Sequence, residues 1–187
     1  TVIPYFERFM RTFPTVAALA NADLDDVLAA WSGLGYYRRA RAMHEAARQL
    51  MEGGHDTLPS SRDELLQMSG IGQYTAAAVA SIAFNEKVAV VDGNVLRVLA
   101  RVTADEGAIE APTTRSRIQG AATALIDPEN PAAFNEAMME LGATVCTPAA
   151  PACLTCPLRR LCRAHREGKV DRLPVKTKRK PSPRVRL

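Results

Sequence analysis

Four cysteines set close together near the C-terminal end carry the clearest chemistry in this sequence. They are Cys146, Cys153, Cys156 and Cys162, and the segments between them hold six, two and five residues. The first residues do not form a basic segment followed by an apolar one, so we expect a reducing compartment in which disulfides are rare. We therefore predict a metal site made of thiolates. The spacing alone leaves a structural zinc ion and an iron–sulfur cluster both open.

A single carboxylate, Asp92, is the second candidate for chemistry. It follows the apolar run 87–91 and precedes an expected helix over residues 95–102, for which Gly93 or Asn94 is the expected cap. At this place a carboxylate can stabilise a cation that develops during a reaction. It can equally be a charge that the helix dipole favours. The residues alone leave both interpretations open.

Twenty residues before Asp92, the tripeptide Gly-Ile-Gly at 70–72 is predicted to join two helices. The first should begin at the capping box of Ser61 and Glu64, and the second is the Ala-rich run from Tyr74, which we expect to be buried. The glycines permit positive φ on both sides of Ile71, which we place in the core. They also leave bare N–H groups at the next helix, which suit a phosphate. The alternative is an ordinary helical hairpin.

The rest of the chain is typical of amphipathic helices. We expect helices over 1–10, over 16–31 in two pieces, from 38 to 51, over 113–126 and over 131–142. In the second of these regions Asn21 or Asp23 is the expected cap, and the side chains expected to point inward are Leu24, Val27, Leu28 and Trp31. The run 87–91 is strand-like but has no partner run, so we interpret it as an extended connector. The predicted fold class is all-α with eight or nine helices.

The net charge of +4 is unevenly distributed along the chain. Residues 157–187 hold twelve Lys and Arg against two acidic residues, whereas residues 1–156 hold twelve against eighteen. A basic segment of this density binds polyanions by neutralising phosphates, in a salt-dependent way. No apolar run approaches membrane-spanning length, so we expect no membrane partner.

The run GIGQYTAAAVASIAFNEKVAVVDGNVLRVLAR resembles, without a gap, the signature of the helix-hairpin-helix DNA glycosylases. Together with TVIPYFERFM, WSGLGYYRRAR, FNEAMMELGATVC and the cysteine spacing, it is similar to the MutY-type adenine glycosylases over residues 1 to about 175. The resemblance implies the all-α fold of that family with a C-terminal [4Fe-4S] cluster loop. It also implies a helical barrel domain at 19–130, a cluster domain made of 1–18 and 131–170, and a basic linker at 171–187.

The resemblance also assigns roles to individual residues. Asp92 is the implied catalytic carboxylate, and the four cysteines are the implied cluster ligands. The implied DNA-binding residues are Gly70, Ile71, Gly72, Tyr74, Thr75, Tyr36, Arg38 and Arg39. Tyr36 matches the tyrosine that adenine glycosylases insert into the DNA stack, although a tyrosine pair in a glycine-rich loop is more often core packing. The bifunctional members carry a nucleophilic lysine where this chain has Tyr74, which argues against a lyase.

The implied function is base excision repair: the protein flips out an adenine mispaired with 8-oxoguanine or guanine in double-stranded DNA and hydrolyses its glycosidic bond. The family's general acid is a glutamate on a helix that would precede Thr1. We therefore expect a fragment or truncated homologue that retains DNA and cluster binding, loses most base excision, and needs a segment or chain that supplies the missing helices. The implied location is the cytoplasm with the nucleoid in a bacterium, or the nucleus or mitochondrion in a eukaryote.

Three alternative functions remain open at this point. A pyrimidine glycosylase of the endonuclease III type would cleave the strand without alkali. A non-enzymatic iron–sulfur DNA-binding module would bind the duplex tightly and release no base. A zinc-stabilised binding domain would contain zinc and no iron.

Overall fold

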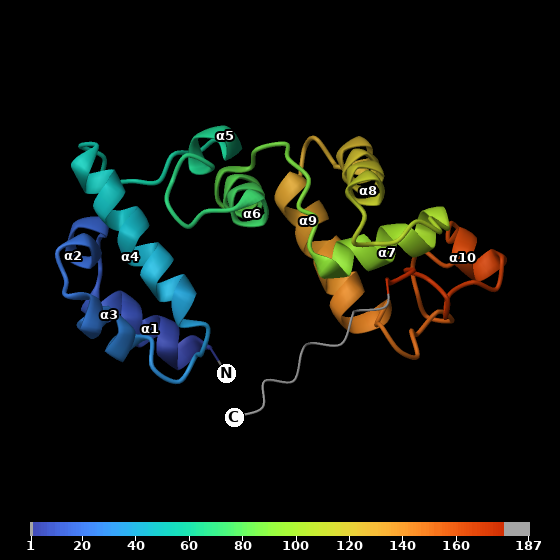
Figure 1. Cartoon of the computed structure of the whole chain (residues 1–187), viewed down its shortest axis with the longest axis horizontal. Coiled ribbons are helices and arrows are strands. Elements are labelled where there is room, and N and C mark those ends of the chain that lie inside the picture. The colour runs from blue at the N-terminus through green and yellow to red at the C-terminus, as the bar shows by residue number, and fades with distance from the viewer. Residues whose placement is uncertain (1, 178–187) are drawn as a thin grey trace, which may run out of the picture. The chain divides into compact units, whose positions relative to one another are not determined.

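The computed structural model describes residues 2–177, and these residues fold into helices joined by loops (Figure 1). The chain divides into two compact units, Thr1–Glu86 and Lys87–Leu187. The predicted basic linker at 171–187 lies in part outside the described residues. The predicted division into a barrel domain, a cluster domain and a linker stays a prediction.

In the first unit a long helix, α4, supports two short ones. The helices are α1 (Ile3–Thr12), α2 (Val16–Ala20), α3 (Leu24–Ala30), α4 (Tyr37–Glu52), α5 (Arg62–Leu65) and α6 (Gln73–Phe84). Helices α2 and α3 pack against α4, α1 packs against α3, and α5 packs against α6. The arrangement is visible in the blue to green part of Figure 1.

Aromatic side chains hold α1 to α3. Phe9 packs edge-on against Phe13 and Trp31, with ring centroids 5.1 and 5.7 Å apart. Val27 is fully buried in the same cluster, as predicted. The prediction for Leu24 is wrong, because its side chain is 37% exposed. Leu24 is the first residue of a short helix, and a terminal position has covering neighbours on only one side along the axis.

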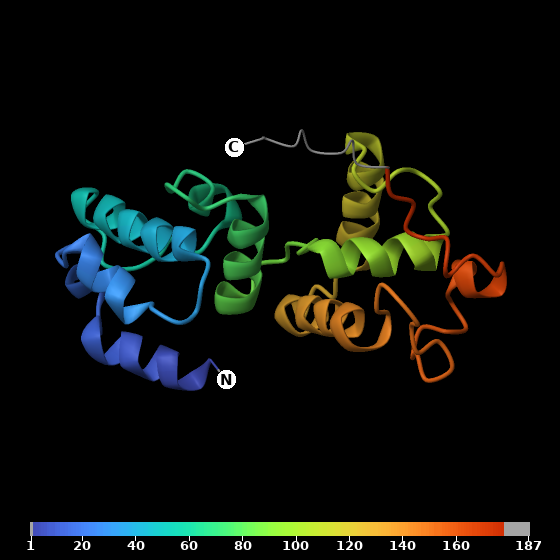
Figure 2. The ribbon, with the colours of Figure 1, turned by 60° about the horizontal axis from the view of Figure 1, so that its bottom comes forward.

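In the second unit α7 is the central helix. The elements are α7 (Gly93–Thr103), α8 (Pro112–Leu125), α9 (Pro131–Glu140), the π-helix η1 (Leu141–Val145) and α10 (Arg163–Arg166). Helix α7 contacts all four of the others, and Figure 2 shows it between α8 and α9. Its apolar face, which includes Val95 and Leu99, packs against Ile118 and Ala122 of α8.

Residues 2–177 contain no β-strand; the only extended pairing among them is one isolated bridge between Ala108 and Val175. The predicted all-α class is therefore confirmed for the described residues. They form ten α-helices and one π-helix, more than the eight or nine expected, because the short helix α10 was not expected and the end of the helix predicted at 131–142 is a separate π-helix. None of these helices is both long enough and apolar enough to span a membrane.

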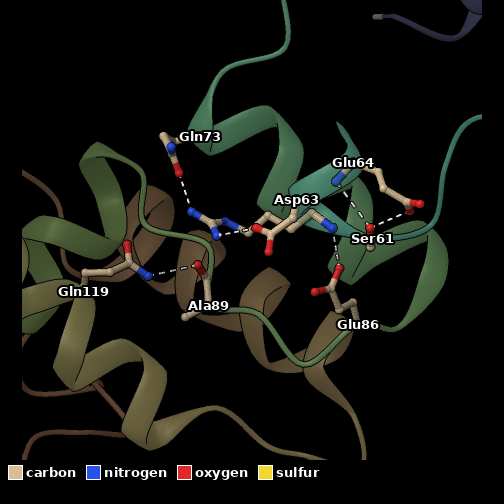
Figure 3. Close-up of polar contacts among 8 residues, drawn as sticks. Ser61, Asp63, Glu64, Gln73, Glu86, Ala89 and Gln119 are labelled. Atoms are coloured by element: carbon tan, nitrogen blue, oxygen red, sulfur yellow. Dashed lines mark hydrogen bonds and ion pairs between the residues drawn. The ribbon is translucent and has the colours of Figure 1, made fainter. Parts of the chain in front are cut away.

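The run 87–91 is an extended connector, as predicted. Its backbone groups bond to side-chain amides instead of to a second strand: Val90 N–H donates to Asn135 Oδ1 at 3.0 Å, and Asn135 Nδ2 donates to Val88 O at 2.9 Å. Gln119 Nε2 donates to Ala89 O at 3.2 Å (Figure 3). These bonds meet the requirement that buried backbone polar groups find partners.

The predicted helix 131–142 ends as an α-helix at Glu140 and continues as the π-helix through Val145. Gly142 lies in this π-helix and packs directly on the start of α7. A Cβ at position 142 would lie 2.5 Å from the Cβ and 3.0 Å from the carbonyl carbon of Asn94. The absence of a side chain at Gly142 therefore sets the approach of η1 to the helix that Asp92 precedes.

We expect Gly142→Ala to lower the free energy of unfolding by about 1–3 kcal/mol, because overpacking against the backbone of Asn94 forces a shift. Gly120→Ala is the matched control. Gly120 lies inside α8, and an added Cβ there meets no atom within 4 Å. That variant should gain roughly 0.5–1 kcal/mol through helix propensity. Urea unfolding followed by circular dichroism measures both, and equal effects of the two variants would contradict the close packing.

Candidate functional site

The turn between α5 and α6 has one glycine in the left-handed region. Gly70 has φ of +76°, as predicted, but Gly72 has φ of −92° and ψ of 175°. The prediction of positive φ on both sides of Ile71 is therefore wrong. Gly72 is the N-cap of α6, and an N-cap residue adopts extended backbone, which needs no positive φ.

The N-terminus of α6 is open to solvent. Gly72, Gln73, Tyr74 and Thr75 are exposed, and Ile71 is half-buried. Gly72 has no side chain with which to cap the first N–H groups, so these groups and the helix dipole can receive an anion. The expectation of a buried helix is only partly right: Ala76, Ala77, Ala80 and Ser81 are buried, but Tyr74, Ile82 and Phe84 are more than 40% exposed.

The start of α5 is fastened to both ends of α6 (Figure 3). Ser61 Oγ accepts from Glu64 N–H at 3.3 Å, which confirms Ser61 as the N-cap, but it is the Ser61 hydroxyl and not its backbone N–H that donates to the Glu64 carboxylate. The N–H of Arg62 donates to Glu86 Oε2 at 2.6 Å, and its guanidinium donates to Gln73 Oε1. A cationic group thus lies beside the N-terminus of α6.

Tyr36 is exposed on an anchored loop, so the core interpretation of this residue is wrong. Its side chain is 77% exposed, and its backbone is left-handed with φ of 50°, which costs a non-glycine residue roughly 1–2 kcal/mol. The indole N–H of Trp31 donates to Gly35 O at 2.9 Å and holds the loop. The exposed Arg39 guanidinium lies 5.1 Å from the ring centroid of Tyr36, and Arg38 is also exposed.

Asp92 is itself the N-cap of α7, which corrects the expected cap at Gly93 or Asn94. Its Oδ1 accepts from Val95 N–H at 2.7 Å, and α7 begins at Gly93 instead of residue 95. Asn94 Nδ2 donates to the other carboxylate oxygen at 3.0 Å. Asp92 thus places its charge at the N-terminus of α7, where the helix dipole favours it, and both carboxylate oxygens are oriented by hydrogen bonds. Capping does not exclude catalysis.

Arg97 connects this carboxylate to the first cysteine. Its guanidinium donates to Asn94 Oδ1 at 2.8 Å, to Gly142 O at 2.8 Å and to Cys146 O at 2.7 Å. Burial lowers the pKa of Arg97 from its ordinary value, while Cys146 and Asp92 act in the opposite direction. Asn94 and Arg97 thus link Asp92 to the loop of cysteines.

All four predicted cysteine ligands line one cavity in the second unit, together with Arg101, Leu141 and Leu158. The pKa of the Cys153 thiol is raised, first by burial and then by the neighbouring Cys146, Cys162 and Cys156 sulfurs. No three His, Cys, Asp or Glu side chains within residues 2–177 converge on a single metal position. The four thiols therefore line the same cavity but are not arranged around a single ion position.

Arg101 is the buried cation of this site, only 2% exposed. Its guanidinium donates to the carbonyl oxygens of Thr147 and Leu173, both at 2.8 Å, and of Pro148 at 3.3 Å. It also lies 3.3 Å from Cys146 Sγ, so its charge counters that of a thiolate. One side chain of α7 thereby holds the start of the cysteine loop and the segment that follows α10.

The outer side of the cysteine loop is basic. Arg159, Arg160, Arg163, Arg166 and Arg172 are exposed. Part of the charge is neutralised internally, because Lys169 pairs with Glu106 at 2.6 Å and with Glu167 at 2.9 Å. Hydrogen bonds and charge from Lys169 lower the pKa of both carboxyls. Arg163 also pairs with Glu167, at 3.6 Å, so the exposed charge that an external anion meets comes chiefly from the other four arginines.

Our interpretation of the sequence missed the contributions of Asn94, Arg97 and Arg101. The sequence does contain a signal for the two arginines, because they stand four residues apart in the otherwise apolar run VLRVLAR. An arginine on a helix face that should be buried needs acceptors inside the protein. The acceptors outside α7 lie 45 or more residues away in sequence.

Comparison with known proteins gives a consistent family. Residues 1–123 match the family described as "HhH-GPD superfamily base excision DNA repair protein". The chain is 47% identical over 180 residues to an adenine DNA glycosylase of Rattus norvegicus and 46% identical over 176 residues to that of Homo sapiens. These matches cover 93% and 92% of this chain but 34% and 32% of the relatives, so the chain spans about a third of their length.

Among solved structures, a thermostable thymine-DNA glycosylase matches with a TM-score of 0.79 and 25% identity. The match covers 89% of this chain and 76% of that one. The helical architecture described above is therefore shared with a known DNA glycosylase.

We expect Arg101→Met to lower the free energy of unfolding by about 2–4 kcal/mol, because it leaves buried carbonyl oxygens without a donor. Arg115→Met is the control, since Arg115 is an exposed residue of α8 and its loss should change stability by less than about 0.5 kcal/mol. Urea unfolding measures both variants. An Arg101 variant as stable as the control would show that its bonds to the loop contribute nothing.

Proposed function

We propose that this chain, which belongs to the HhH-GPD superfamily of base excision DNA repair proteins, excises adenine from duplex DNA by hydrolysing its N-glycosidic bond. The observation that carries the proposal is the oriented carboxylate of Asp92 at the N-terminus of α7, in a chain 47% identical to an adenine DNA glycosylase. Tyr74, in place of a nucleophilic lysine, supports hydrolysis without strand cleavage.

In the proposed reaction the adenine is flipped out of the stack before chemistry. Tyr36 is suited to take its place, because it is exposed and its loop is anchored by Trp31. The solvent-exposed N-terminus of α6 is suited to hold a backbone phosphate, with Arg62 beside it. Arg38 and Arg39 add positive charge next to Tyr36.

Cleavage of the glycosidic bond leaves positive charge on the sugar. The Asp92 carboxylate stabilises this oxocarbenium ion, or forms an adduct with it that water then hydrolyses. Asn94 and the Val95 N–H hold the two carboxylate oxygens while the charge develops. The departing adenine needs a proton from a second acid, and no residue of this chain is assigned that role.

We assign a [4Fe-4S] cluster to Cys146, Cys153, Cys156 and Cys162. All four thiols line one cavity, and a set of four cysteine thiolates is the donor set that a [4Fe-4S] cluster needs. When bound, the cluster supplies four metal–thiolate bonds that fix the loop. The loop in turn presents Arg159, Arg160 and Arg163 to the DNA backbone.

The proposed substrate is an adenine mispaired with 8-oxoguanine or guanine. Incubating the chain in excess with such a duplex should release adenine slowly, because no acid of this chain is assigned to protonate the leaving base. The strand should break only after alkali treatment. Strand scission without alkali would instead establish a lyase of the endonuclease III type. A bound duplex with no release would establish a DNA-binding module that lacks its acid.

Asp92→Asn separates capping from catalysis. Asparagine also caps helices, so we expect the free energy of unfolding to change by less than about 1 kcal/mol. The rate of adenine release in single-turnover assays should fall at least ~10²-fold, because the amide lacks the charge that stabilises the cation. Asp127→Asn is the control and should retain the rate, because Asp127 is a half-buried loop residue that accepts from Glu129 N–H and has no proposed role in catalysis. An active Asp92→Asn protein would remove Asp92 from the mechanism.

Metal analysis of the purified chain should find about four iron atoms per protein and little zinc, because one [4Fe-4S] cluster holds four iron atoms. Cys153→Ser should lower both the iron content and the visible absorbance, because serine is a poor ligand for the cluster. Zinc without iron in the wild-type protein, isolated under anaerobic conditions, would contradict the cluster.

A further inference from the structure

We propose that Gln49 of α4 is a positioning residue that holds the turn between α5 and α6 in the shape that receives a DNA phosphate. This inference rests on the proposed function. Gln49 carries none of the roles assigned above. It lies on a helix that forms neither side of the hairpin.

Gln49 bonds to two backbone groups just before the turn. Its Oε1 accepts from Ser69 N–H at 2.7 Å, and its Nε2 donates to Gln67 O at 3.2 Å. A primary amide thereby takes one donor and one acceptor from the segment that leads into Gly70. Without it, both groups would bond to water and the segment would lose its fixed orientation.

A second contact lies on the same face of α4. A Cβ at Gly70 would approach the Cβ of Ala42 to 2.6 Å and its Cα to 3.1 Å. Ala42 and Gln49 are seven residues apart, about two helical turns, so they share one side of the helix. The side of α4 that touches the turn therefore combines close packing at Gly70 with hydrogen bonds at Ser69 and Gln67.

The N-terminus of the same helix carries the other proposed DNA contact in this unit. Tyr36 is the N-cap of α4, thirteen residues before Gln49, which corresponds to about 20 Å along a helix. Helix α4 is thus a rigid spacer between the Tyr36 loop and the hairpin. Gln49 fixes the hairpin end of that spacer.

The test is a phosphate-by-phosphate map of duplex binding. Duplexes in which single phosphates are replaced by neutral methylphosphonates are titrated with the wild-type chain and with Gln49→Met, which keeps the length of the side chain but loses both bonds. The variant should bind the unmodified duplex about tenfold more weakly, equivalent to one hydrogen bond to a charged group. It should lose its sensitivity to methylphosphonate at one or two adjacent positions and keep it elsewhere.

This pattern distinguishes positioning from a general structural role. A structural defect lowers the folded fraction and weakens binding to every duplex by the same factor. Gln49 is exposed, so water replaces its bonds and the Tm should change little. Thr123→Val is the matched control: it removes a side-chain bond to one backbone carbonyl within α8 of the second unit and should leave the map unchanged.

Amide hydrogen exchange without DNA tests the bonds directly. The Ser69 amide should exchange about tenfold faster in Gln49→Met. It should stay protected in Gln49→Glu, which keeps the acceptor. If the wild-type chain does not bind the duplex, the proposed function fails. If it binds and Gln49→Met gives the same map, or if Ser69 exchange is unchanged, the role of Gln49 is overturned while the proposed function stands.

Discussion

The second unit depends on two guanidinium groups of α7 that bond to backbone carbonyls of the cysteine loop. Between Cys146 and Arg163 the chain forms turns and no regular helix, so the carbonyl groups that its own turns do not pair need donors from elsewhere. Arg97 and Arg101 supply them, and Arg101 does so while buried. Because Asp92 caps the same helix, the element that orients the carboxylate also shapes the loop that holds the thiols.

Hydrogen bonds from helix side chains to backbone groups also hold other extended or turning segments that have a proposed role. Asn135 and Gln119 bond to the connector before Asp92, and Gln49 bonds to the segment before Gly70. A β-protein would satisfy such groups with a neighbouring strand. In this chain side chains on packed helices do so, which means that helices remote from the DNA can determine the shape of the segments that contact it.

Local patterns predicted local structure well. Ser61 capped the start of a helix as expected, and the connector at 87–91 formed without strand pairing because no second run was present. Long-range geometry was beyond the sequence. The bonds of Arg101 reach residues more than 45 positions away, and no periodicity encodes them. The cap at Asp92 was misassigned because Gly93, Asn94 and Asp92 are all good caps, and the sequence does not show which of them adopts the extended backbone that Asp92 has in the structure. The cluster, the DNA-binding residues and the domain division stay predictions, since the fold alone does not test them.

The dual role of Asp92 raises the question of whether a capping carboxylate retains capacity for chemistry. A carboxylate has about four lone-pair sites on its two oxygens. Val95 N–H occupies one site on Oδ1, and Asn94 Nδ2 occupies one on Oδ2. Each oxygen therefore keeps an acceptor site, and the hydrogen bonds that fix the group come from the start of α7 itself. Capping thus orients the carboxylate and leaves its negative charge available, and stabilisation of a sugar cation requires both.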